Sequence, residues 1–141
     1  MGSCRVALCH FDGGPRSRYT ASMTRLSTLP LSQSDHDTIV AVVAAVTSRW
    51  PVERIILFGS KARGDDEPDS DIDLLVITPR ELDRPAEDAM QDAAWETGLA
   101  HGRCVQLVIR SHDRWYHGID QATPLRLQID EDGVEIFRHD G

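Results

Sequence analysis

Two short apolar runs, residues 52–58 and residues 72–77, constrain the fold of this chain more than any other feature. Both runs are rich in β-branched residues and are shorter than a typical helix, so each predicts a buried strand. Gly59 closes the first run and Pro79 follows the second, as is typical of strand ends. The chain is therefore expected to build a sheet around these two strands.

Helices and further strands are expected on either side of this pair. Ser34 is a suitable N-cap for a helix from Asp35 to Arg49. The buried stripe of that helix is expected to comprise Ile39, Val42, Val43 and Val46, which recur at helical spacing. The remaining expected elements are a helix at 85–99, a strand at 104–109, a short helix after Ser111, a helix from Pro124 and a strand at 134–137. This order predicts an α+β fold, a mixed β-sheet with helices packed on it.

The length of 141 residues fits one folded domain. Residues 1–30 show no sustained period and are interrupted by glycine and proline, so we expect a flexible N-terminal tail there and a single domain over residues 31–141. Met23 is an alternative start of the chain. No apolar run approaches the roughly 18 residues of a membrane span, and no signal-peptide pattern is present, so we expect a cytoplasmic protein with no membrane partner.

The composition also narrows the choice of partners. The formal net charge is −8, whereas phosphate contacts need clustered lysine and arginine, so no direct binding of nucleic acid is expected. The histidines and cysteines show no arrangement typical of a zinc site. Trp95, Trp115 and Tyr116 offer rings that stack on a base, although packing in the core or against a partner is the commoner role of such residues.

Asp71 and Asp73 stand two residues apart at the start of the second apolar run. Side chains at this spacing on a strand point to the same face. Two carboxylates on one face repel each other unless a cation or protons compensate. The pair therefore predicts a divalent metal site, and Mg²⁺ fits best because it binds a few carboxylate oxygens together with water and phosphate. The alternative, a solvated acidic strand edge, is disfavoured by the apolar residues that follow at once.

Gly59 and Ser60 end the first strand, which we expect to lie beside the strand that carries the aspartates. A glycine lets the backbone approach a ligand closely, and a helical turn after Ser60 would direct its N–H groups outward as a phosphate site. Lys61 and Arg63 are expected to add positive charge nearby. A phosphate-binding turn beside a metal-binding carboxylate pair is the minimum apparatus for phosphoryl or nucleotidyl transfer.

This combination, Gly59-Ser60, ten residues, then Asp71-x-Asp73, resembles the signature of the polymerase-beta-like nucleotidyltransferase superfamily. The chain is most similar to the minimal (MNT-type) single-domain members, as in HEPN/MNT toxin–antitoxin pairs, and a looser resemblance extends over residues 35–138. The resemblance implies the nucleotidyltransferase fold. It also implies that Gly59 and Ser60 bind the triphosphate, that Asp71 and Asp73 are catalytic and hold Mg²⁺, and that Arg63 contacts phosphate.

One position departs from the pattern of the superfamily. Its members commonly carry a third carboxylate on the next strand, facing the first two, and in this chain the corresponding residue is Gln106. A glutamine amide is neutral, cannot act as a base and binds Mg²⁺ more weakly than a carboxylate. Slow activity, the use of another carboxylate such as Glu96, and loss of activity are the outcomes that this substitution allows.

The resemblance implies a Mg²⁺-dependent enzyme that transfers a nucleoside monophosphate, AMP from ATP, to an acceptor hydroxyl. The chain has no room for a separate acceptor-binding domain, so the acceptor is expected on a partner protein. Minimal members often act as antitoxins of a helical HEPN-type toxin, and this role fits the size of the chain. The alternative is a catalytically weak or inactive binding module that neutralises or regulates its partner by direct contact, and Gln106 favours that alternative.

Overall fold

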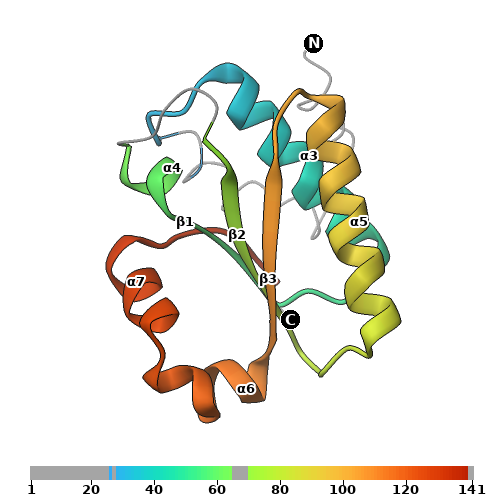
Figure 1. Ribbon diagram of the computed structural model, residues 1–141, viewed down its shortest axis with the longest axis vertical. Helices are drawn as coiled ribbons and strands as arrows, with labels where there is room; N and C mark the ends of the chain where they lie inside the picture. The colour runs from blue at the N-terminus through green and yellow to red at the C-terminus, as the bar shows by residue number, and fades with distance from the viewer. Residues whose placement is uncertain (1–25, 27, 65–69, 140–141) are drawn as a thin grey trace.

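The strands of this computed structural model form one mixed sheet. They are β1 (Arg54–Phe58), β2 (Ile72–Thr78), β3 (Val105–Ser111) and β4 (Val134–Arg138). The structure describes residue 26, residues 28–64 and residues 70–139, and within this part the strand order is β3-β2-β1-β4 (Figure 1). β1 runs antiparallel to its neighbours β2 and β4, whereas β2 and β3 are parallel. The predicted α+β fold with a mixed sheet is confirmed.

One face of the sheet is covered by α3 (Gln33–Arg49) and α5 (Arg84–Ala100), which also pack against each other (Figure 1). The predicted stripe of α3 is buried in this core, together with side chains of β2 and α5: Ile39, Val42, Val43, Val46, Ile72, Leu74, Val76, Met90 and Ala94. Burial of each large aliphatic side chain stabilises the fold by roughly 1.5–3 kcal/mol. Because neighbouring residues on a strand face opposite ways, burial of Ile72 and Leu74 turns Asp73 to the other face.

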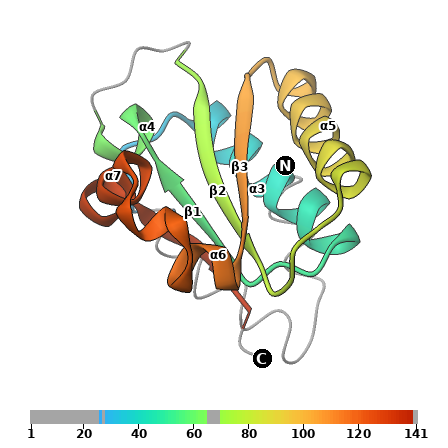
Figure 2. The same ribbon diagram turned by 60° about the horizontal axis from the view of Figure 1, so that its bottom comes forward.

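The other face carries α6 (His112–His117), the 3-10 helix η1 (Ile119–Ala122) and α7 (Pro124–Asp132), as Figure 2 shows. A second apolar cluster lies beneath them, formed by Ile56, Phe58, Leu75, Ile77, Trp115 and Ile129. α6 begins directly after β3 ends, so it lies at the far end of the sheet from the first residues of β2 and β3. Asp71 and Gln106 at those first residues are exposed.

The amino end of α3 lies earlier than the sequence pattern predicts. Ser32, rather than Ser34, is the N-cap, because its side-chain oxygen accepts a hydrogen bond from the Asp35 N–H at 3.0 Å. The Ser34 carbonyl instead accepts a hydrogen bond from the Thr38 hydroxyl at 2.7 Å, within the helix. With this start, Asp35 lies on the inner side of the first turn and is only 2% exposed.

Other element ends differ from the prediction by a few residues. β1 begins at Arg54 rather than at residue 52, β3 covers residues 105–111 rather than 104–109, and the pattern did not predict η1. The predicted tail falls largely on residues 1–25 and 27, which lie outside the described residues, as does Met23; Leu26 is fully buried in the core. No helix in the described part of the chain is long and apolar enough to cross a bilayer.

Candidate active site

The turn from β1 into α4 (Ser60–Arg63) brings the backbone against the aspartate strand. Gly59 has φ of 82° and ψ of −160°, a conformation that essentially only glycine adopts. A Cβ atom there would lie 2.7 Å from Oδ2 of Asp73, closer than real side chains come. Phe58, the last residue of β1, pairs with Asp73 in the antiparallel register, so the two motifs are neighbours as predicted. Glycine is required here both by its backbone conformation and by the approach of Asp73.

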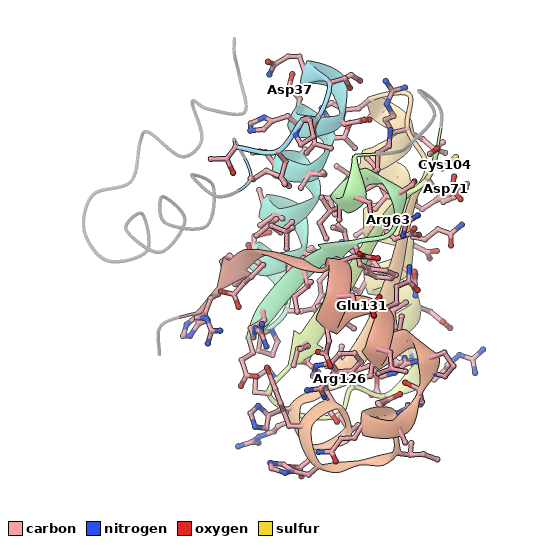
Figure 3. The ribbon with its side chains drawn as sticks, turned by 90° about the vertical axis from the view of Figure 1, so that its left-hand side faces the viewer. Asp37, Arg63, Asp71, Cys104, Arg126 and Glu131 are labelled. Carbon is pink, nitrogen blue, oxygen red and sulfur yellow. The ribbon has the colours of Figure 1, made fainter. Side chains whose placement is uncertain are left out.

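Asp71 and Asp73 are held at the open end of β2. Asp73 is half-buried within the strand, whereas Asp71 directly precedes the strand and is exposed. Ile72, between them, donates its N–H to the Cys104 carbonyl at 2.9 Å, and Figure 3 shows Asp71 and Cys104 close together at the edge of the molecule. Burial, and then the negative charge of Asp71, raise the pKa of Asp73. A bound cation would relieve both effects.

Gln106 occupies the position beside the pair, as the sequence predicts. It pairs with Asp73 in the parallel register of β2 and β3. Its Nε2 donates a hydrogen bond to Oδ2 of Asp71 at 2.8 Å, so it orients that carboxylate instead of adding a third negative charge. No group of three histidine, cysteine, aspartate or glutamate side chains forms a metal cluster among the described residues. Glu96 is exposed on α5, whose apolar side packs on the opposite face, and we do not assign it to the site.

Lys61 does not add positive charge to the phosphate site, and the prediction that it does so is wrong. Its side chain is fully buried, and its Nζ lies 2.7 Å from Oδ2 of Asp35 on α3. Oδ1 of the same carboxylate accepts a hydrogen bond from Nε of Arg103, just before β3, at 2.6 Å. Asp35 therefore ties α4, on one side of the site, to the chain entering β3 on the other side.

Sequence reasoning missed this network because its members are distant along the chain. Lys61 is 26 residues from Asp35, and Arg103 is 68 residues from it. Asp35 has the position of an ordinary first-turn helix residue, which gives no sign that it is buried. The one available signal is that Lys61 is the sole lysine of the chain and lies within the glycine motif.

Arg63 lies at the last position of α4, one helical turn from Ser60. Its NH1 is 3.3 Å from Oδ2 of Asp132, the last residue of α7, in an exposed ion pair. Exposed pairs of this kind contribute about 0–1 kcal/mol, so this ion pair by itself does little to fix the position of the guanidinium. The structure thus places Arg63 near the turn at the contact of α4 with α7.

The mixed sheet, the glycine turn and the carboxylate pair together define a fold of the nucleotidyltransferase class. The sequence model for the nucleotidyltransferase domain matches residues 32–130, which is well over half of the chain. The chain belongs to the family of nucleotidyltransferase domains. The predicted nucleotidyltransferase domain is therefore confirmed.

Two of the similar solved structures, with TM-scores of 0.52 and 0.50, support the same fold. A crystal structure of a toxin–antitoxin with AMP-PNP is 20% identical, with 77% of this chain and 76% of that chain covered and a TM-score of 0.52. A mutant of the toxin–antitoxin MntA–HpeT is also 20% identical, with 70% and 72% covered and a TM-score of 0.50. A tri-AMPylated Shewanella oneidensis HEPN toxin in complex with MNT antitoxin is 20% identical, with 70% and 67% covered and a TM-score of 0.45. No curated protein matches the sequence significantly.

Proposed function

We propose that this chain is a Mg²⁺-dependent nucleotidyltransferase that transfers AMP from ATP to an acceptor hydroxyl on a partner protein. The proposal is carried by the approach of Gly59 to Asp73, which sets a turn suited to a triphosphate against a carboxylate pair. Membership of the nucleotidyltransferase family supports the reaction class. The fold neighbour with AMP-PNP supports ATP as the donor.

The residues of the site fit Mg²⁺. This ion usually binds one or two carboxylates and completes its shell with water and substrate phosphates, so Asp71 and Asp73 suffice as protein ligands. Burial, and then the charge of Asp71, raise the pKa of Asp73, and a cation bound between the two carboxylates would act in the opposite direction. When bound, Mg²⁺ supplies neutralisation of the charge on the phosphates and lowers the pKa of a coordinated hydroxyl.

Each group of the chain has a defined task in this proposal. Gly59 and Ser60 bind the β- and γ-phosphates, and Arg63 turns from Asp132 to contact them. Asp71 and Asp73 would hold the cation. The acceptor oxygen forms a bond to the α-phosphorus while the bond from that phosphorus to the bridging oxygen breaks, and pyrophosphate leaves with the electron pair. The hydroxyl proton passes to water, because the Gln106 amide does not accept it.

The partner that we propose is a helical HEPN-type toxin, for which this chain acts as the antitoxin. The two fold neighbours with TM-scores of 0.52 and 0.50 are toxin–antitoxin structures, and this context supports the assignment. The net charge of −8 also suits a basic partner.

A second candidate function is a binding module that regulates its partner by contact alone. The observation that favours it is the hydrogen bond from Gln106 to Asp71, because among the described residues the site then has two carboxylates and no third one to serve as a base. Under this alternative the site binds nucleotide weakly or not at all, and neutralisation of the partner does not depend on Asp71.

An incubation of the full chain with Mg²⁺, α-labelled ATP and a HEPN-type toxin distinguishes the two functions. If the chain is an enzyme, label appears on the toxin. The amount of label then falls at least about a hundredfold with Asp71→Asn or Asp73→Asn and does not change with Asp88→Asn. Asp88 is a matched control because it is an exposed aspartate near the start of α5, remote from the pair, and its Oδ1 lies 3.4 Å from Nε of Arg84. Neutralisation of the toxin without label, unaffected by Asp71→Asn, would instead establish the binding module.

A further inference from the structure

A cavity of about 470 Å³ opens between α5 and the outer edge of β3, and it shares the Gln106 side chain with the carboxylate site. It is lined by Gln91, Asp92, Trp95, Val105, Gln106 and Leu107. Gln106 belongs to both places, because the same side chain that lines the cavity donates a hydrogen bond to Asp71 at 2.8 Å. The Gln106 side chain therefore connects a group bound in this cavity with the carboxylate pair.

The strand order determines on which side of the reacting phosphorus this cavity lies. Ser60 follows β1, the aspartates stand on β2, and Gln106 stands on β3, so the three lie in a row across one end of the sheet. In an in-line transfer, the attacking oxygen and the leaving pyrophosphate lie on opposite sides of the α-phosphorus. With the pyrophosphate at the β1 turn, the acceptor oxygen arrives from the β3 side, which is the side of the cavity.

We propose that this cavity is the docking site for the acceptor segment of the partner, a polypeptide that carries a hydroxyl side chain flanked by basic residues. This inference rests on the proposed function, since it names where the acceptor of that transfer binds. The acceptor hydroxyl enters past Gln106, and the neighbouring residues of the same segment pack on α5.

The exposed surface of α5 has the chemistry that such a segment needs. The indole of Trp95 lines the cavity and is 44% exposed. Exposed tryptophan is typical of protein interfaces, where it supplies much of the binding free energy. Asp92 also lines the cavity, and its carboxylate adds negative charge there. This charge attracts basic side chains and repels the phosphates of RNA.

The edge of β3 determines how the segment binds. In the described part of the chain, β3 pairs only with β2 and would otherwise offer its outer edge to another strand. Gln91 donates a hydrogen bond from Nε2 to the Leu107 carbonyl on that edge at 2.9 Å. This contact occupies an acceptor that an added strand needs, so the segment binds through its side chains against Trp95 and Asp92.

The test measures binding of labelled probes to the full chain by fluorescence anisotropy, in the presence of Mg²⁺ and non-hydrolysable ATP. The probes are a short peptide with tyrosine flanked by arginines, its counterpart with glutamates in place of the arginines, and a single-stranded RNA. We expect the arginine peptide to bind with a Kd below about 1 mM, the weak end of the affinity scale. Trp95→Ala is expected to weaken this binding at least about tenfold.

Matched variants distinguish binding in the cavity from nonspecific binding to the surface of α5. Leu99→Ala removes an apolar side chain that is similarly exposed on the same helix but does not line the cavity, and its effect is expected to stay within about twofold. Asp92→Lys is expected to reverse the preference between the arginine and glutamate peptides. ATP binding, measured separately by calorimetry, reports on the proposed function.

The docking site is overturned if the arginine peptide does not bind the native chain, if Trp95→Ala and Leu99→Ala have equal effects, or if RNA binds more tightly than the peptide. Any of these results with ATP binding intact refutes the docking site and leaves the nucleotide site standing. Absence of ATP binding refutes the proposed function itself.

Discussion

Replacement of Gly59 by alanine tests the arrangement on which the site depends. The backbone at Gly59, with φ of 82° and ψ of −160°, lies in a region that costs an L-residue about 1–3 kcal/mol, so Gly59→Ala is expected to lower the free energy of unfolding by that amount. The new Cβ also stands 2.7 Å from Oδ2 of Asp73, whereas ordinary contact begins at 3.4 Å. The carboxylate must therefore move by several tenths of an ångström or more.

Such a displacement is large for a metal ligand, because coordination distances are held to within about 0.2 Å. We expect Gly59→Ala to weaken Mg²⁺–ATP binding at least about tenfold by calorimetry, and to lower label transfer about a hundredfold, the usual cost of a misplacement near 1 Å. The free energy of unfolding from urea titration gives the strain separately from the loss of binding.

Gly102→Ala is the matched control for the backbone strain. Gly102 also has a positive φ, of 74°, but a Cβ there meets nothing within 4 Å. This variant is expected to lose about 1 kcal/mol of stability while it binds Mg²⁺–ATP normally. The reasoning is refuted if Gly59→Ala binds as the native chain does, or if both variants lose binding to the same degree.

Three further changes probe the surroundings of the site. Lys61→Met leaves a buried carboxylate of α3 short of one partner and should cost about 3 kcal/mol of unfolding free energy in urea; a loss below about 1 kcal/mol would contradict the role of the ion pair. Gln106→Glu adds a third carboxylate and should tighten Mg²⁺ binding severalfold in calorimetry, so unchanged affinity would show that this side chain does not face the ion. Burial alone would raise the pKa of Glu135, but hydrogen bonds from Arg138 and Arg54 outweigh it and lower the pKa. The stability that Glu135 contributes is therefore present above its unfolded pKa and is lost as pH falls through the lowered value. Glu135→Gln should flatten this part of the acid dependence of Tm, and an unaltered profile would refute the assignment.

The parts of the site that lie within one stretch of sequence follow from local rules. Alternation along β2 turns Asp73 away from the core once Ile72 and Leu74 are buried, and this alternation can be read directly from the apolar pattern. The position of Gln106 follows from the order of strands, since the next strand in sequence is also the neighbour of β2. These features depend on spacing alone.

The parts that depend on distant residues do not follow from local rules. Lys61 reads as an exposed cation of the motif, and only the packing of α3 against α4 reveals that it is buried with Asp35. The cap of α3 was misplaced because Ser32 and Ser34 are both suitable N-cap residues, and the structure favours the one whose side chain reaches the Asp35 N–H. Contacts between residues distant along the chain determine whether the lysine is buried and which serine is the cap, and a local sequence pattern does not reveal these contacts.

The most direct measurement is a crystal structure of the chain with Mn²⁺ and a non-hydrolysable ATP analogue, with the ion located by its anomalous scattering. We predict an ion within coordination distance, about 2.0–2.3 Å, of both Asp71 and Asp73, and the triphosphate against Gly59 and Ser60. An ion or a triphosphate found elsewhere on the molecule, with these side chains unoccupied, would contradict the assignment of the site.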